Sequence, residues 1–196
     1  MTQITDIQIR EALHRKKFAR VAQSPKTLVV DELGLVHARA RVDIAVINGC
    51  VHGYEIKSEA DSLRRFDRQL AIYSTCLEKL TFVCAERHLT ALYSLTPKWC
   101  GILLVARGPR SGLDFITVRK PTRNPGLDKL KLAYLLWRPE VIDLLTRLDA
   151  PRALVKKSRV DMYDFIAERL SVSEITDYVR ECFISRETWR HPPRHA

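Results

Sequence analysis

The sequence lacks any run of apolar residues close to the roughly 18 in succession that a membrane-spanning helix needs. It also lacks a basic-then-apolar signal peptide, because Asp6 and Glu11 fall where the apolar stretch would have to be. The chain has 196 residues, 46% of them hydrophobic and 29% charged, which is typical of a globular protein with one good core. We therefore expect a cytoplasmic protein without a membrane partner.

The sequence also lacks a C-x-x-C pair, and its cysteines are odd in number. Both features argue against a disulfide framework and against a zinc ribbon. We expect buried free thiols at all five positions, which are Cys50, Cys76, Cys84, Cys100 and Cys182.

Positive charge is abundant, with a formal net charge of +10, and it is concentrated in two segments. Residues 10–26 carry six basic residues and one acid, and residues 107–138 carry eight basic residues and two acids. Basic clusters on a nearly neutral background favour a polyanionic partner such as nucleic acid, although a solubilising surface gives the same pattern. The candidate nucleic-acid-binding residues are Lys16, Lys17, Arg20, Arg119, Lys120 and Arg123.

The spacing of apolar residues predicts alternating helices and strands up to about residue 124 and helices alone afterwards. The strand–helix–strand pattern over residues 80–107 predicts parallel pairing. Ser58 and Asp61 form a capping-box-like pair that predicts a helix starting at Ser58. The other expected helices span residues 4–23, 87–95, 127–137, 138–148, 159–170 and 173–184, and the expected strands span 27–33, 41–47, 51–57, 80–85, 101–107 and 113–120.

The register of the hairpin over residues 41–57 decides which charges meet. A two-residue turn at Asn48-Gly49 would separate Asp43 from Glu55, whereas a three-residue loop that includes Cys50 places them opposite each other. The three-residue loop also gives a good core face of Val42, Ile44, Val46, His52, Tyr54 and Ile56. We predict this register, with Gly49 supplying a positive φ.

In this register Asp43, Glu55 and Lys57 converge at one strand end. Carboxylates this close repel each other unless a cation lies between them. Lys57 is one candidate for that cation, and a divalent metal is another. Two carboxylates and the backbone carbonyl of Ile56 form an oxygen-only set of the kind that Mg²⁺ takes.

Residues 69–73, on the expected helix after the hairpin, read Gln-Leu-Ala-Ile-Tyr. With Asp43 and with Glu55-Ile56-Lys57, this segment resembles the PD-(D/E)XK nuclease superfamily, and especially its RecB-like branch. The resemblance covers roughly residues 4–107. It implies a restriction-endonuclease-like α/β core over residues 1–124, with a mixed sheet flanked by helices. Residues 125–196 would form an all-helical C-terminal extension packed on or beside this core.

The resemblance implies a role for each matching residue. Asp43 and Glu55 would hold the metal, and Lys57 would position the attacking water and offset phosphate charge. Gln69 would reach back to the water or substrate, with Tyr73 one turn later on the same helical face. Glu11 is the candidate carboxylate of the first helix, because the stripe Ile4, Ile7, Glu11, Phe18 and Ala22 places it on the apolar face; a surface position is the alternative.

Glu32 is a further acidic candidate, and the histidines at 14, 37, 52 and 88 match no motif position. The function implied is a nuclease that hydrolyses phosphodiester bonds, in DNA, with Mg²⁺ or Mn²⁺ as cofactor. The alternative is a nuclease-fold module of a mobile element or defence system that binds nucleic acid or recruits a partner, with little or no cleavage. A protein partner or a homodimer is compatible with either.

Overall fold

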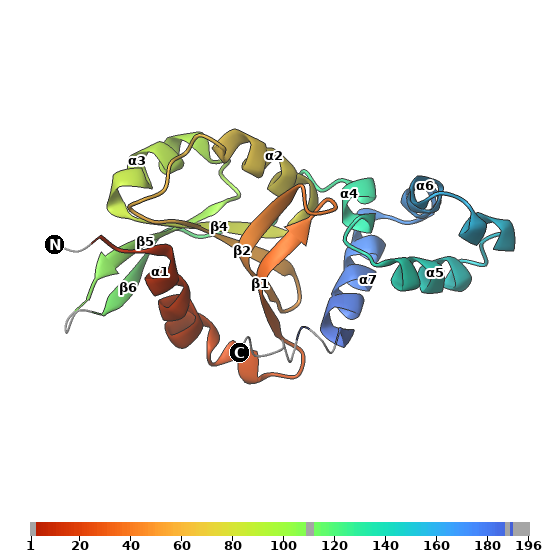
Figure 1. Ribbon diagram of the computed structural model, residues 1–196, viewed down its shortest axis with the longest axis horizontal. Coiled ribbons are helices and arrows are strands. Elements are labelled where there is room, and N and C mark those ends of the chain that lie inside the picture. Colours follow the sequence, from red (N-terminus) through yellow and green to blue (C-terminus); the bar gives the residue numbers. More distant parts are fainter. Residues whose placement is uncertain (1–2, 109–111, 187–188, 190–196) are drawn as a thin grey trace.

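The computed structural model describes residues 3–108, 112–186 and 189. Its centre is a six-stranded sheet whose strands lie side by side in chain order (Figure 1). The strands are β1 (Leu28–Leu35), β2 (Ala40–Ile47), β3 (Val51–Lys57), β4 (Lys79–Cys84), β5 (Gly101–Arg107) and β6 (Leu113–Arg119).

The direction of the strands changes along the sheet. β1, β2 and β3 form an antiparallel meander. β3, β4 and β5 are parallel, because helices α2 (Phe66–Cys76) and α3 (Glu86–Leu95) return the chain between them. β6 closes the sheet in the antiparallel direction. The predicted parallel pairing is confirmed, and the protein is a mixed α/β fold.

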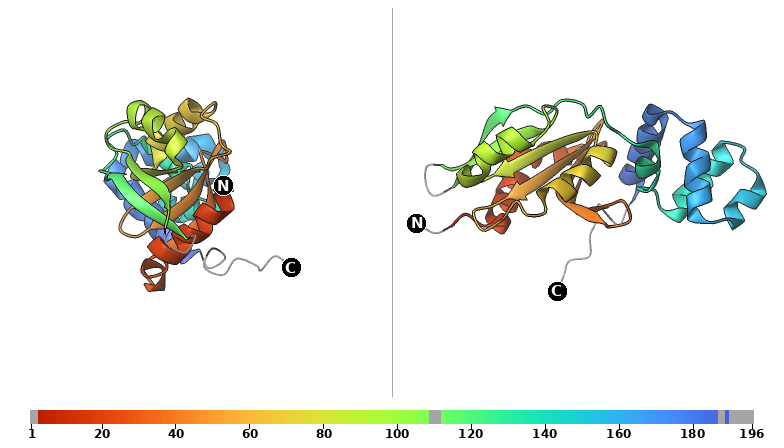
Figure 2. Two further views of the ribbon diagram at one scale, coloured as in Figure 1. Left: turned by 90° about the vertical axis from the view of Figure 1, so that its left-hand side faces the viewer. Right: turned by 90° about the horizontal axis from the view of Figure 1, so that it is seen from above.

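Each face of the sheet has its own hydrophobic core. Helix α1 (Asp6–Leu13) covers one face, where Ile9 and Leu13 pack with Ile44 of β2. Helices α2 and α3 cover the other face, where Tyr73 and Leu92 are fully buried. Figures 1 and 2 show α1 and the α2–α3 pair on opposite sides of the sheet.

The β2–β3 hairpin has the predicted three-residue loop. Ile47 pairs with Val51, and the amide N–H of Asn48 donates to the carbonyl oxygen of Cys50 at 3.1 Å. Gly49 has a φ of 67°, a conformation that glycine adopts at little cost. The predicted register is therefore confirmed.

The regular alternation of side chains breaks beside Asp43. The register places Asp43 between Glu32 of β1 and Glu55 of β3. Among the described residues, however, Asp43 is not paired with either of them in the strand ladders. Glu32 has a φ of 57°, which costs a non-glycine residue roughly 1–3 kcal/mol. On β2 beside this position, Val42 joins the core on the α2 face, while Ile44 belongs to the α1 face. The prediction that Val42 and Ile44 share a face was wrong, because it assumed an unbroken period of two.

Helix α1 is shorter than the helix predicted over residues 4–23, and its phase differs. The chain continues as a π-helical turn (His14–Phe18) and a 3₁₀ turn (Val21–Gln23). Ile7 and Glu11 are exposed. The predicted stripe was wrong because Ile4, which set its phase, precedes the helix. The buried residues of α1 are Ile9, Ala12 and Leu13.

Helix α2 starts later than predicted. The backbone N–H and the hydroxyl of Ser58 both donate to Oδ2 of Asp61, at 2.7 and 2.6 Å. The capping-like pair therefore forms, but it closes a turn, and the helix begins only at Phe66.

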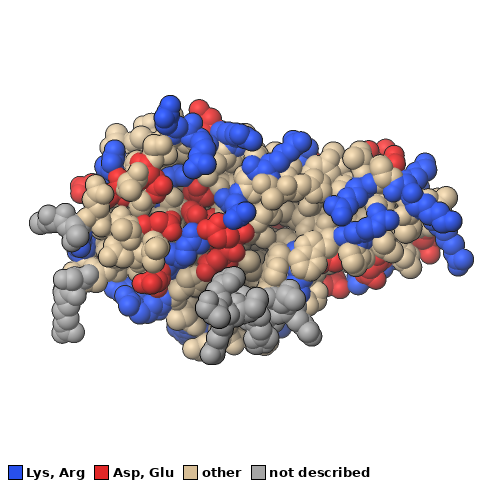
Figure 3. All heavy atoms as spheres, viewed as in Figure 1, with Lys and Arg blue, Asp and Glu red and all other residues tan. Residues whose placement is uncertain are grey.

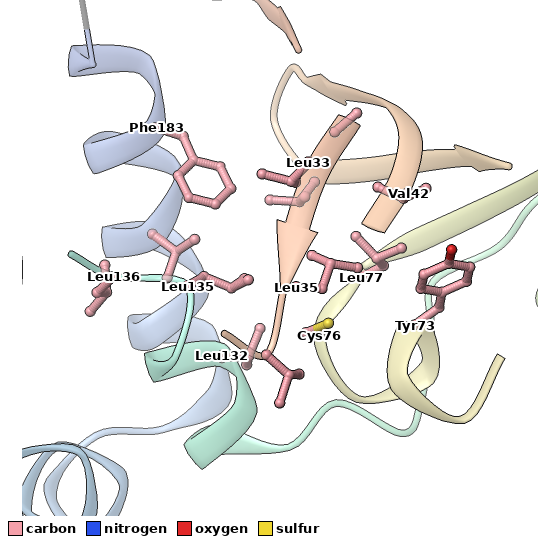
Figure 4. Close-up of a cluster of buried hydrophobic side chains, with 14 of the residues drawn as sticks. Leu33, Leu35, Val42, Tyr73, Cys76, Leu77, Leu132, Leu135, Leu136 and Phe183 are labelled. Carbon is pink, nitrogen blue, oxygen red and sulfur yellow. The ribbon is translucent and has the colours of Figure 1, made fainter. Parts of the chain in front are cut away.

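After β6 every regular element in the described part of the chain is helical. The last helices pack against the open end of the meander, and Figure 4 shows Leu135 and Phe183 opposite Leu33 and Leu35 of β1. One continuous core thus joins these helices to the sheet; the predicted boundary at residues 124–125 stays a prediction. The helices are α4 (Lys129–Ala133), α5 (Arg138–Arg147), η4 (Arg152–Lys156), α6 (Arg159–Arg169) and α7 (Val172–Ser185).

Two composition-based expectations can be compared with the structure. All five cysteines are free; four are buried, as predicted, and Cys50 is half-buried. Within the described ranges, no helix combines the length and the apolar character needed to cross a bilayer.

A buried carboxylate ties the last helix to the sheet. Glu78 has 1% of its surface exposed. Nη1 of Arg180 on α7 donates to its Oε1 at 2.7 Å and to its Oε2 at 2.8 Å. It also accepts the backbone N–H of Val51 at 2.8 Å. A buried ion pair of this kind contributes modestly as a whole, but losing one partner strands a charge in the core.

We predict that Arg180→Met lowers the free energy of unfolding by about 3 kcal/mol or more, because it leaves the Glu78 carboxylate buried without its main partner. Urea denaturation measures this directly. Arg147→Met is the matched control, since the ion pairs of Arg147 with Asp143 and Glu181 are exposed. Equal losses in the two variants would contradict the role assigned to the buried pair.

Candidate functional site

Glu55 and Lys57, alternate residues of β3, face α2 as a buried ion pair. Their exposed fractions are 2% and 6%. Nζ of Lys57 donates to Oε1 of Glu55 at 2.9 Å. A pair so deeply buried must satisfy its remaining donors and acceptors inside the protein.

Helix α2 supplies the missing partners through Gln69 and Tyr73. The amide of Gln69 accepts from Lys57 at 3.1 Å and donates to Oε1 of Glu55 at 2.8 Å. The hydroxyl of Tyr73 lies 2.8 Å from Oε2 of Glu55 and 2.7 Å from the carbonyl oxygen of Arg41, and its one proton serves one of them. Burial and the Glu55 carboxylate raise the pKa of Tyr73, so the phenol stays protonated. Glu55, Lys57, Gln69 and Tyr73 thus form one closed network, the Glu55 cluster.

Asp43 lies next to this cluster but binds elsewhere. Its Oδ2 accepts the backbone N–H of Ile56 at 2.6 Å, and its Oδ1 accepts Nη2 of Arg10 at 3.2 Å. Burial and, to a lesser extent, the nearby Glu55 carboxylate raise the pKa of Asp43 to about 7, although the Ile56 N–H and Arg10 act in the opposite direction. The two carboxylates are therefore close enough to repel each other, although within the described part of the chain no hydrogen bond joins Asp43 to the Glu55 cluster.

Arg10 of α1 gathers a second group of acids around Asp43. Its guanidinium lies 2.8 Å from Glu32 and within 4 Å of Asp6 and Asp31 as well. Figure 3 shows acidic side chains clustered over α1 and the neighbouring strands, with basic atoms among them. Arg10 was not predicted as a site residue, because its role depends on the tertiary contacts of α1 with Glu32 and Asp43.

The oxygen donors predicted to bind a metal are Asp43, Glu55 and the carbonyl of Ile56. Among the described residues, no three histidine, cysteine, aspartate or glutamate side chains are placed to hold an ion together. The two carboxylates nevertheless fit Mg²⁺ in donor chemistry, since it commonly takes one or two carboxylates and keeps several waters. A divalent ion would relieve the repulsion that raises the pKa of Asp43. It would have to replace the Arg10 contact to do so.

A cleft of about 410 Å³ opens beside the Glu55 cluster, and Gln69 lines it. The charged residues that line it are Glu32 and four exposed arginines. Only Arg41 among the four has a described acidic partner, Glu32 at 3.8 Å. We call this the arginine cleft; the arginines are Arg39, Arg41, Arg65 and Arg68. These arginines were not among the predicted binding residues, because they come from two short segments outside the two basic clusters of the sequence.

The basic residues predicted to bind nucleic acid lie elsewhere. Arg119 is used inside the protein, donating to the carbonyl oxygen of Cys100 at 2.7 Å. Lys16 pairs with Asp114 at 2.6 Å, and Arg123 lies 3.6 Å from the buried Glu78. The remaining three, Lys17, Arg20 and Lys120, are exposed.

Glu11 and the histidines lie outside the Glu55 cluster. Glu11 is on the surface near Arg15 and Gly112, so the structure supports the surface position over the catalytic one. His14 pairs with Asp31, His52 with Thr81 and His88 with the carbonyl oxygen of Ser58.

We predict that between pH 5 and pH 8 the wild type loses about 2–3 kcal/mol more stability than Asp43→Asn. The folded pKa of about 7 lies above the unfolded value near 3.9, so folding retains a proton that the unfolded chain releases. Stability from this group is complete below pH 4 and is lost as the pH rises to 7. Urea denaturation across this range is the measurement.

Asp31→Asn is the matched control, because Asp31 also borders Arg10 but is 46% exposed. Adding Mg²⁺ at pH 8 should stabilise the wild type and not Asp43→Asn. Identical pH profiles for wild type and Asp43→Asn would rule out the raised pKa.

Comparison with known proteins identifies the family of the chain. A solved structure of a protein of unknown function from Silicibacter pomeroyi matches all of this chain and 98% of its own, with a TM-score of 0.44 and 12% identity. Protein cII of Enterobacteria phage P4 is 27% identical over 151 residues, which are 77% of this chain and 56% of that protein, so the match spans little more than half the relative's length. Residues 6–191 match the family model of bacteriophage P4 protein cII. The chain therefore belongs to the bacteriophage P4 protein cII family.

Proposed function

We propose that the protein is a metal-dependent nuclease of the PD-(D/E)XK type that hydrolyses phosphodiester bonds in DNA and acts in the cytoplasm. One observation carries this proposal: the buried Glu55–Lys57 pair adjoins an arginine-lined cleft, with Gln69 belonging to both. A structural ion pair needs no anion-binding cleft beside it. A phosphodiester enzyme needs both a polar cluster for the chemistry and cations for the strand.

In this proposal Asp43, Glu55 and the carbonyl oxygen of Ile56 hold Mg²⁺ or Mn²⁺. When bound, the ion stabilises charge on a phosphate oxygen and lowers the pKa of a coordinated water. Tyr73 fixes one oxygen of Glu55, and Gln69 fixes the other. The carboxylate thus keeps its orientation.

Lys57 supplies positive charge where negative charge develops on the phosphate. Its ammonium group is held between Glu55 and Gln69, so its position is set before substrate binds. Gln69 lines the cleft as well, and its amide is placed to orient a water or a phosphate oxygen at the boundary.

The arginine cleft is the proposed binding surface for the strand. Its four guanidinium groups face a single acid, Glu32, so the lining has a net positive charge. Arginine also suits phosphate geometrically, because its planar fork binds two oxygens at once.

A second candidate function is a nucleic-acid-binding or partner-recruiting module without cleavage. The contact between Arg10 and Asp43 favours it, because an arginine stands where the first proposal needs an ion. The family is named after a bacteriophage protein, which agrees with a place in a mobile element. Cleavage measurements separate the two candidates.

We predict that Glu55→Gln and Lys57→Met slow DNA cleavage in Mg²⁺ by orders of magnitude, because each removes a charge that acts in the transition state. DNA affinity measured in Ca²⁺ should change little, since the cleft arginines remain. Glu11→Gln is the control: the same chemical change on the surface of α1 should leave cleavage intact.

Wild-type protein that binds DNA but shows no cleavage sensitive to EDTA would decide for the binding module. Cleavage that persists in both Glu55→Gln and Lys57→Met would place the chemistry elsewhere.

We predict that Arg65→Ala combined with Arg68→Ala weakens DNA binding and reduces the slope of log affinity against log salt by about two units. Each phosphate contact contributes nearly one unit through counterion release. Arg64→Ala is the matched control, since Arg64 is exposed next to Arg65 but does not line the cleft. Binding is measured in Ca²⁺ over a salt series. If Arg64→Ala reduces the DNA affinity and the salt slope as much as Arg65→Ala alone does, only the overall charge of the protein matters.

A further inference from the structure

A second cavity, of about 590 Å³, lies between the β1–β2 turn and the C-terminal helices. Its size is in the range of sites that bind a small molecule or a single nucleotide. Aromatic rings dominate one side of it, and we call it the aromatic pocket. The ring-bearing residues are His37, Tyr134, Trp137, Tyr163, Phe183 and Trp189.

The rings stand at several angles around the pocket. His37 lies over Tyr134 with centroids 4.6 Å apart and an interplanar angle of 33°, and Tyr134 lies 4.9 Å from Tyr163. Trp137 is 47% exposed, with the guanidinium of Arg186 over its ring at 4.0 Å. Exposed and partly exposed rings of this kind are stacking surfaces for a planar group.

Positive charge surrounds the same rings. Arg138 and Arg159 line the pocket and are exposed. Partial burial lowers the pKa of His37, and the positive charges of Arg159, Arg39 and Lys131 lower it further. Arg186 does not contribute free charge, because Glu140 neutralises it at 2.6 Å.

The β1–β2 turn that forms one wall has an unusual backbone. Val36, His37 and Ala38 all have positive φ angles, of 49°, 55° and 61°. Consecutive non-glycine residues with positive φ angles are strained, and such strain persists only where the surrounding structure enforces the conformation. Here it places the His37 ring in the aromatic pocket and makes Ala38 a wall of both cavities.

We propose that the aromatic pocket holds an unstacked base of the nucleic acid strand whose phosphates lie in the arginine cleft. A base inside a duplex is stacked and cannot enter, so single-stranded nucleic acid is the preferred ligand. This inference rests on the nucleic-acid binding in the proposed function, and it adds the substrate class.

A planar base carrying a phosphate fits the pocket's rings and cations, and a free nucleotide has the same chemistry. The position of the pocket favours a strand. Ala38 borders both cavities, and Arg39, the next residue, lines the arginine cleft, so a strand that leaves the pocket meets cations at once.

The test compares a labelled single strand of about 12 thymidines with its duplex, by fluorescence anisotropy in Ca²⁺. Trp137→Ala should weaken single-strand binding by about tenfold through the lost stacking surface, and Arg159→Ala should weaken it through the lost positive charge. Duplex binding should change by less than about twofold, because no base leaves the stack. Quenching of tryptophan fluorescence by thymidine monophosphate tests the free nucleotide.

Tyr93→Ala is the matched control for Trp137→Ala. Tyr93 is 57% exposed and has Arg119 over its ring at 5.4 Å, but it lies on α3, outside the pocket. Arg159→Ala removes an exposed side chain, so it keeps the test valid if Trp137→Ala fails to fold.

The outcomes separate this inference from the proposed function. If the pocket variants bind single strands normally while Arg65→Ala with Arg68→Ala does not, the inference is overturned and the proposed function stands. Equal losses for single strand and duplex also overturn it. If the arginine variants bind normally but the pocket variants lose single strands, the pocket site stands and the cleft assignment fails. If thymidine monophosphate quenches the tryptophan fluorescence and the oligonucleotide does not compete with it, the pocket binds a free nucleotide. The proposal that it holds a base of a strand is then overturned.

Discussion

A carboxylate as deeply buried as that of Glu55 has to be neutralised and fully hydrogen-bonded, and much of the arrangement around the sheet follows from this constraint. Lys57 supplies the charge from the same strand, but the other bonds come from Gln69 and Tyr73 on α2. These two residues are four apart, so the helix must turn one particular face toward β3. Arg65, the N-cap one turn before Gln69, and Arg68, the residue before Gln69, then lie at the cleft that Gln69 also lines. The position of the cleft arginines is thus coupled to the satisfaction of one buried acid.

The two neighbouring carboxylates of the hairpin are neutralised by different partners. Glu55 has a lysine toward α2, and Asp43 has Arg10 toward α1. Arg10 has three further acidic neighbours, and together the acids raise its pKa above the ordinary value although burial opposes this. It can therefore leave Asp43 without becoming an unpaired charge, because Glu32 already lies at 2.8 Å. Whether a divalent ion displaces this contact is what distinguishes a nuclease from a binding module here.

The strands, the parallel crossovers and the three-residue loop followed from local patterns in the sequence, because Asn48-Gly49 and the alternating apolar residues act over a few neighbours. The grouping of Glu55, Lys57, Gln69 and Tyr73 was accessible only through the family resemblance, since it joins a strand to a helix. Three features were out of reach. The period of two breaks at Val42, beside the positive φ of Glu32, and the phase of α1 places Arg10 rather than Glu11 at the site. The cleft arginines meet only in the folded chain. Each depends on tertiary packing that no window of sequence contains.

The C-terminal helices are part of the same structural unit as the sheet, and this bears on what the unit does. They share a continuous core with β1 and β2, and Arg180 neutralises the buried Glu78 beside β4. They also complete the aromatic pocket, which neither the β1–β2 turn nor the helices form alone. The family match extends over residues 6–191 and therefore includes both parts. Ala38 of the strained turn lines both cavities, so the turn connects the arginine cleft to the pocket that the helices complete. In the proposed complex the cleft takes the phosphates of a strand and the pocket takes one of its bases.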